Sequence, residues 1–79
     1  MIIEEKIDLY AVFKKGRIIP IAFQWKKDKF IIDKIKHTCK RKMGESAVTC
    51  YSVRVDKTDY KISINALDTS CYLNRIDIH

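Results

Sequence analysis

The sequence predicts an all-β fold, a six-stranded antiparallel meander that forms a small barrel or a strongly curled sheet. Apolar residues recur at every second position in several segments, as they do on one face of a strand. These segments are rich in β-branched and aromatic residues, and short polar turns separate them. At 79 residues the chain has the size of one small domain, residues 1–79, which buries about 60–65% of its unfolded surface.

The first two predicted strands flank a basic turn. The first covers residues 7–13, in which apolar residues occupy every second position. The second, residues 18–25, places four large side chains on one face: Ile19, Ile21, Phe23 and Trp25. Pro20 cannot donate a hydrogen bond to a neighbouring strand, which indicates a strand start or an edge position. Gly16 supplies the positive φ that a tight hairpin needs.

The third predicted strand covers residues 29–37. A helix over residues 31–43 is the alternative, because Ile31, Ile35, Cys39 and Met43 recur at a spacing of four. The β-branched and aromatic residues 30–32 favour the strand. We expect a bulge near Asp33 or Lys34 that moves the inward position from Ile32 to Ile35.

The connections around this strand are predicted to be long. The turn at residues 26–29 has no glycine, so we expect a longer or bulged loop there. Residues 38–47 contain a basic run with Gly44 and Ser46, and they are interpreted as the longest loop of the chain.

Three further strands are expected in the second half of the chain, over residues 48–55, 60–66 and 71–78. In the fifth strand the inward residues are Tyr60, Ile62, Ile64 and Ala66. In the sixth, Tyr72, Ile76 and Ile78 lie on one side and Leu73 on the other. That mixed pattern indicates a bulge or burial on both faces.

Positive charge is concentrated in one third of the chain. The formal net charge is +6, and residues 14–42 alone hold eleven Lys and Arg against two Asp, a net charge of +9. The candidate nucleic-acid-binding residues are nine of these: Lys14, Lys15, Arg17, Lys26, Lys27, Lys29, Lys40, Arg41 and Lys42. Together with aromatics outside the core, such as Tyr10 and Tyr72, they would bind a phosphate backbone with little sequence preference.

Two other interpretations of the basic surface stay open. Lysines at turns and on edge strands also keep small β proteins in solution and prevent sheets from pairing with one another. The domain could instead bind a protein partner or form a homodimer through an exposed strand edge, which the mixed pattern of residues 71–78 favours.

The residues that could carry chemistry do not form a known catalytic motif. The chain has no Gly-x-Ser-x-Gly, no phosphate-binding glycine loop and no His-Glu-x-x-His. Cys50 could act as a nucleophile only with His37 as its base, since the other histidine is His79 at the end of the sequence. We therefore expect no enzyme, no cofactor and no small-molecule substrate.

The three cysteines, Cys39, Cys50 and Cys71, are typical of free thiols in a reducing compartment, because they are odd in number and lack a CxxC pair. With His37 they are the ligand types of a zinc site, but without the paired spacing of structural sites, and we predict no metal. The chain has no run of about 18 apolar residues, and its N-terminus is acidic where a signal peptide is basic. We expect a cytoplasmic protein without membrane contact.

Several motifs resemble those of a group of small, uncharacterised bacterial all-β domains. The shared patterns are Pro20-x-Ala22-Phe23-x-Trp25, Phe30-x-Ile32-x-x-Ile35, Tyr51-x-Val53-Arg54, Tyr60-x-Ile62 and Leu73-x-Arg75-Ile76. They span residues 7–77 and are mainly core positions. The chain departs from the group at two places. The group often has glycine where this chain has Lys57-Thr58-Asp59, and its last strand begins with an aromatic residue where this chain has Cys71-Tyr72. The resemblance implies a bacterial protein and, since some members look to be encoded beside DNA-repair polymerases, a role near nucleic acid.

Overall fold

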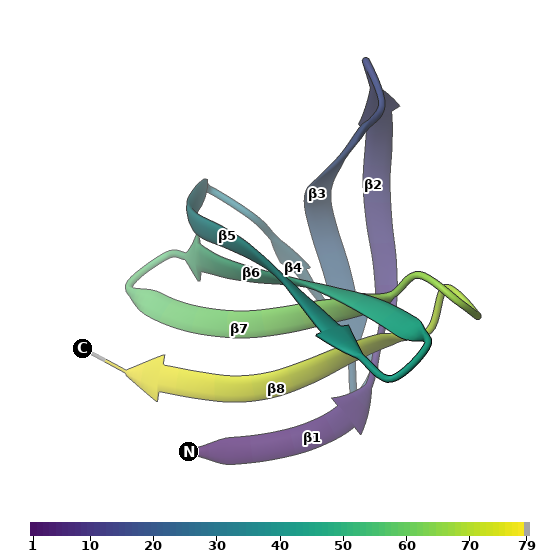
Figure 1. Ribbon diagram of the computed structural model, residues 1–79. Coiled ribbons are helices and arrows are strands. Elements are labelled where there is room, and N and C mark those ends of the chain that lie inside the picture. The colour runs from purple at the N-terminus through teal and green to yellow at the C-terminus, as the bar shows by residue number, and fades with distance from the viewer. Residues whose placement is uncertain (79) are drawn as a thin grey trace.

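The computed structural model describes residues 1–78, apart from the Met43 side chain, and holds eight strands in two antiparallel sheets (Figure 1). The strands are β1 (Ile2–Lys6), β2 (Asp8–Lys14), β3 (Arg17–Trp25), β4 (Asp28–Ile31), β5 (Lys34–Met43), β6 (Ser46–Val55), β7 (Thr58–Asn65) and β8 (Cys71–Ile78). Five strands form one sheet in the order β1-β8-β7-β6-β5, and three form the other in the order β2-β3-β4.

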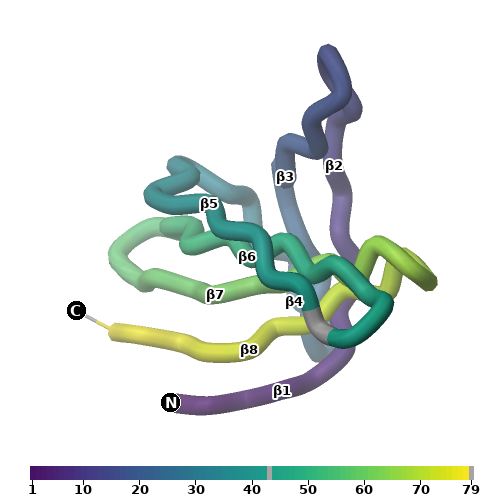
Figure 2. Tube along the Cα trace, in the orientation of Figure 1, coloured from purple at the N-terminus to yellow at the C-terminus, as the bar shows by residue number. Residues whose placement is uncertain are grey.

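The predicted all-β class is confirmed, but the six-stranded barrel is wrong, because residues 1–78 form eight strands and neither of their two sheets is closed. The reason is that two segments bend and so contribute a strand to each sheet (Figure 2). At the first bend, between β1 and β2, the Ile7 N–H donates to the Cys71 carbonyl at 3.0 Å. At the second, the Ile32 N–H donates to Ile21 in one sheet and the Asp33 N–H to Arg54 in the other, both at 2.8 Å.

The core lies between the two sheets and is rich in aromatic rings. Phe23 of the three-stranded sheet is fully buried, stacks on Phe30 at 5.0 Å and meets Tyr60 of the five-stranded sheet edge-on at 5.3 Å. The buried cluster comprises Ile7, Phe23, Tyr51, Val53, Tyr60, Ile62, Ile64 and Leu73. Such rings contribute both buried area and favourable pair geometry, so they hold the two sheets together.

Bulges change which residues face this core. In the pairing of β2 with β3 the register shifts between Tyr10 and Ala11, opposite Ile21. Ile19 and Ile21 are 37% and 45% exposed. Their predicted inward position is therefore wrong, and Ile18 packs against the core instead. The bulge expected in residues 71–78 is confirmed, because the register of β7 against β8 shifts between Lys61 and Ile62 of β7.

The shift in β8 moves its inward positions. Leu73 is fully buried and Ile76 packs against the same core, although they were predicted on opposite sides. Tyr72 instead lines the outer face, Ile78 is exposed, and Ala66 lies exposed beyond the end of β7.

The segment that was predicted as strand, loop or helix forms two strands. The helix over residues 31–43 and the loop over residues 38–47 are both wrong, because β5 continues to Met43 and turns directly into β6. The predicted irregularity near Asp33 corresponds to the bend between β4 and β5, and both Ile32 and Ile35 pack against the core. The strand β1 precedes the first predicted strand and was not expected.

The turn between β3 and β4 is shorter than expected. Trp25 pairs with Asp28, so the turn holds two residues, Lys26 and Lys27, with φ of 51° and 71°. Positive φ at both positions is the geometry of a type I′ hairpin, which glycine and asparagine adopt with little strain. The position of the turn is as predicted, but its two-residue form could not be expected from the sequence, because lysine seldom adopts this conformation.

Replacing Lys27 by glycine is expected to raise the free energy of unfolding by about 0.5–1 kcal/mol, because the left-handed strain exceeds the entropy that glycine adds to the unfolded chain. The substitution leaves the Lys26 ammonium 4.9 Å above the Trp25 ring. Urea denaturation monitored by circular dichroism measures the change. The control is Lys57→Gly in the turn between β6 and β7, where the positive φ belongs to Asp56 instead, and a gain of the same size there would contradict this explanation.

Candidate functional site

The outer face of the five-stranded sheet, which points away from the core, carries a polar hollow of about 460 Å³. In β6 and β7 the side chains alternate, so that Val53 and Ile62 are buried while Ser52 and Lys61 reach the other face. We call this region the outer hollow. Its lining residues come from five strands: Glu4, His37, Cys39, Arg41, Val48, Cys50, Tyr51, Ser52, Lys61, Ser63, Asn65, Tyr72 and Asn74.

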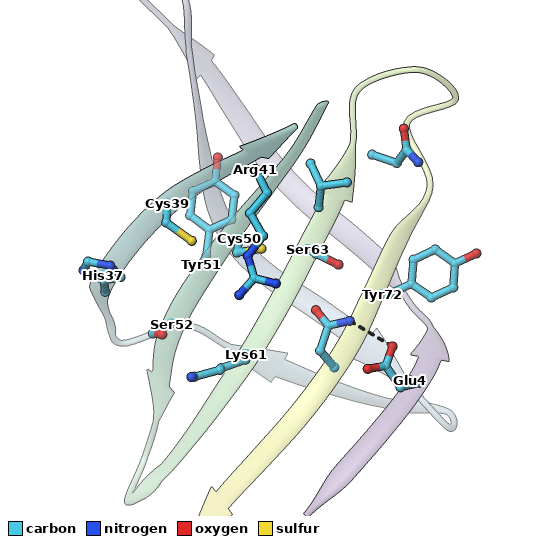
Figure 3. A pocket seen from close by; sticks show the side chains of 13 residues that line it. Glu4, His37, Cys39, Arg41, Cys50, Tyr51, Ser52, Lys61, Ser63 and Tyr72 are labelled. Atoms are coloured by element: carbon cyan, nitrogen blue, oxygen red, sulfur yellow. Dashed lines mark hydrogen bonds between the residues drawn. The ribbon is translucent and has the colours of Figure 1, made fainter. Parts of the chain in front are cut away.

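Positive side chains dominate the charge of the outer hollow. Arg41 of β5 and Lys61 of β7 reach it from two sides, and His37 lies at its β5 rim (Figure 3). The single acidic residue in the lining is Glu4, whose carboxylate accepts a hydrogen bond from the Asn74 amide at 3.3 Å. The hollow therefore presents cations beside neutral hydrogen-bonding groups.

Other cations near this face are already paired. The Asp59 carboxylate accepts from Lys36 Nζ and from Arg54 Nε, both at 2.9 Å. Neither Arg41 nor Lys61 takes part in any ion pair within residues 1–78. Their charges are thus available to an anionic ligand.

Two thiols form part of the floor of the outer hollow. Cys39 and Cys50 occupy directly opposed positions in the pairing of β5 with β6. Burial, followed by the neighbouring Cys39, raises the pKa of the Cys50 thiol above its ordinary value of 9.0. A raised pKa keeps this thiol protonated at neutral pH, whereas a cysteine nucleophile needs a lowered one.

The four potential zinc ligands do not gather. His37, Cys39 and Cys50 line the outer hollow, but Cys71 packs against the core on the other side of the sheet. Within the described part of the chain no group of three or more His, Cys, Asp and Glu side chains could hold a metal ion. His79 lies outside the described residues.

The nine predicted nucleic-acid-binding residues fall in three places. Lys14, Lys15 and Arg17 lie at the turn between β2 and β3, and Lys26, Lys27 and Lys29 at or beside the turn at the other end of β3. The third group, Lys40, Arg41 and Lys42, lies on β5. Only Arg41 of the nine lines the outer hollow, while Arg17 and Lys40 line a second hollow between β3 and β5.

The aromatic residues expected to remain free of the core are found at different places. Tyr72 lies at the β8 side of the outer hollow (Figure 3). Tyr10 is on the three-stranded sheet, where the Lys29 ammonium sits 4.6 Å above its ring and its hydroxyl donates to Gln24 at 3.3 Å. Tyr72 alone of the two is placed to assist a ligand of the outer hollow.

Sequence reasoning missed most of the outer hollow. Lys61 and Ser63 were placed on the outward face of their strand, but nothing in the pattern marked that face as hollowed. The face of the sheet on which Asn74 lies could not be predicted, because the bulge opposite Ile62 changes the alternation of side chains in β8. The usable signal was the all-polar outward set of β7, Lys61, Ser63 and Asn65.

No helix within residues 1–78 is long and apolar enough to cross a membrane. The chain matches no protein-family model, and comparison with curated proteins and with solved structures finds none that is significantly similar to it.

Proposed function

We propose that the protein is a small, non-catalytic binding module that takes single-stranded nucleic acid on the outer face of its five-stranded sheet. The observation that supports this proposal is the pair of cations, Arg41 and Lys61, which form no ion pair within residues 1–78 and lie on a hollowed surface with a single carboxylate, Glu4. Sheet faces bind single strands by combining backbone contacts from cations with aromatic side chains on which bases stack. Here Tyr72 offers the ring.

The neutral groups suit the bases rather than the backbone. Ser63, Asn65 and Asn74 offer donors and acceptors to a base edge. The Asn65 oxygen also accepts from the Leu67 N–H at 2.9 Å and the Asn74 amide donates to Glu4, which leaves the Asn65 amide N–H and the Asn74 oxygen for a ligand. With cations for phosphates and adaptable partners for bases, the ligand class is an oligonucleotide and the sequence preference is weak.

A single-stranded oligonucleotide with a fluorescent label tests the proposal by anisotropy. Binding is expected at about 50 mM salt and weakens strongly by about 200 mM, since counterions are released on binding. Replacing Arg41 and Lys61 by alanine is expected to reduce the slope of log affinity against log salt by about 0.7 for each cation removed.

The matched control is the double variant Lys26→Ala, Lys27→Ala, which loses the same charge at a turn outside the outer hollow. It should retain most of the affinity. Equal losses in both double variants would show that only net charge matters, and absence of binding at low salt would refute the proposal. Tyr72→Leu should weaken binding by about 1–3 kcal/mol, the value of one stacked base.

The alternative prediction is a protein-interaction or homodimerisation module with an exposed strand edge, which the mixed apolar pattern of residues 71–78 favours. These residues form β8, which lies between β1 and β7 and has a strand on each side. Its mixed apolar pattern therefore has another cause, a bulged strand inside the sheet.

A further inference from the structure

The strand β5 has a free edge. It lies at one end of the five-stranded sheet and, among the described strands, pairs only with β6. Alternate residues of an edge strand direct their N–H and C=O groups away from the sheet, where they can pair with an added strand. With ten residues, β5 is long for an exposed edge.

A hollow of about 600 Å³ adjoins this edge. It exists because β3 and β5 diverge from the bend at Asp33. Ala22–Trp25 of β3 pair with β4 and the Ile21 carbonyl accepts from Ile32, whereas the residues of β3 before Ile21 pair with no described strand on that side. Ile18, Ile35 and Tyr51 contribute apolar surface to the hollow. Arg17 from β3 and Lys40 from β5 add a positive charge on each side.

The two strands that border the hollow are not equivalent templates. On β3, Pro20 has no N–H to donate, and the Ile18 carbonyl already accepts a hydrogen bond from the Tyr51 hydroxyl at 2.9 Å. On β5 no proline occurs. An added strand would therefore pair with β5 and place its far side against β3.

The charge of β5 determines which kind of strand can pair with its free edge. The strand carries five basic side chains, Lys34, Lys36, Lys40, Arg41 and Lys42, and no acidic one. A second copy of the chain that paired through the same edge would bring like charges opposite one another, which is destabilising. A strand with acidic side chains would instead complement them.

We infer that the free edge of β5 binds an extended, acidic segment of a partner protein as an additional strand. Main-chain hydrogen bonds to β5 provide the attachment, and alternate apolar side chains of the segment enter the hollow beside Ile18, Ile35 and Tyr51. Carboxylates at the two ends of the segment, on the same face as these apolar side chains, lie beside Arg17 and Lys40, which line the same hollow. The hollow that receives the segment lies on the face of β5 opposite the outer hollow, so the inference does not depend on the function proposed for that face.

A short synthetic peptide is the probe, in which every second residue faces the hollow: these positions hold central valines flanked by glutamates, and threonines lie between them. Binding is measured by isothermal titration, and amide hydrogen exchange of the protein is followed by NMR. The inference predicts slower exchange at alternate amides of residues 38–42. A peptide with N-methyl groups on alternate residues keeps the side chains but loses the hydrogen bonds, and it should bind about tenfold more weakly or worse.

Charge reversal provides the second arm. The double variant Arg17→Glu, Lys40→Glu should bind the glutamate peptide at least about tenfold more weakly and should gain affinity for a valine–lysine peptide, a gain that a misfolded protein cannot show. The control Lys26→Glu, Lys27→Glu, at the other end of β3, should behave as the native protein.

Three results would overturn the inference. The first is equal binding of the N-methylated peptide, and the second is exchange protection confined to residues outside β5. The third is displacement of the glutamate peptide by a single-stranded oligonucleotide that protects the same amides, which would make the edge a general anion surface.

Discussion

Replacing Phe23 by alanine is expected to lower the free energy of unfolding by about 3–5 kcal/mol. The Phe23 side chain is fully buried and contacts rings from both sheets, Phe30 at 5.0 Å and Tyr60 at 5.3 Å. The substitution removes these contacts and leaves a cavity that the two sheets cannot close by a small movement. A loss of this size is a large fraction of the stability of a small domain.

Urea denaturation measures the loss, with the fluorescence of Trp25 and circular dichroism as independent probes. Phe13→Ala is the matched control, because the Phe13 ring is 79% exposed at the hairpin tip, and its replacement should change stability by less than about 0.5 kcal/mol. Similar losses in the two variants would show that Phe23 does not join the sheets.

Replacing Ile7 by alanine is expected to cost about 2–4 kcal/mol and to loosen both sheets together. Ile7 is 8% exposed and lies at the bend where β1 becomes β2. Its backbone N–H is bound to the five-stranded sheet, and the next residues pair with β3. Its side chain therefore packs at the junction of the two sheets.

Native-state hydrogen exchange shows whether the loosening is shared. Faster exchange is expected in β3 as well as in β8, because a residue at the junction supports both sheets. Ile2→Ala, in the preceding strand β1 and 74% exposed, should leave exchange in β3 unchanged. Acceleration in one sheet alone after Ile7→Ala would mean that the bend is only a connection.

The strands with a clean alternation could be predicted from the sequence. In β7, Tyr60, Ile62 and Ile64 are buried as the period of two requires. The bends could not be predicted, because periodicity reports which face is buried and not which neighbour supplies the hydrogen bonds. Ile7 is buried at the bend itself and fits the alternation of the residues that follow it. The pattern therefore passes from one sheet to the other without any indication that the chain bends there.

Charge misled the interpretation of residues 38–47. Three consecutive basic residues were read as a loop, but they form part of an edge strand, where such residues are common because they prevent unwanted pairing. The bulge at Ile21 misled in another way: it turned two large apolar residues of β3 toward solvent. Both errors arise from tertiary context that a single sequence does not contain.

The candidate site was predictable only in part. Arg41 was recognised from its basic neighbours, whereas Lys61 is a single lysine in an otherwise ordinary strand. What makes Lys61 notable is that curvature and pairing across β5, β6 and β7 place it on the same surface as Arg41. No local motif records that proximity.

The pairing of β1 with β8 affects when the protein can fold. The amino group of Met1 donates to the Ile76 carbonyl at 2.8 Å, so strands from opposite ends of the described chain lie side by side. A ribosome releases the residues of β8 after all the others described here, and β1 has no partner in the sheet before then. Leu73, which is fully buried, also arrives with β8. The five-stranded sheet can therefore be completed only after β8 has been synthesised, and folding of this region follows its synthesis instead of accompanying it.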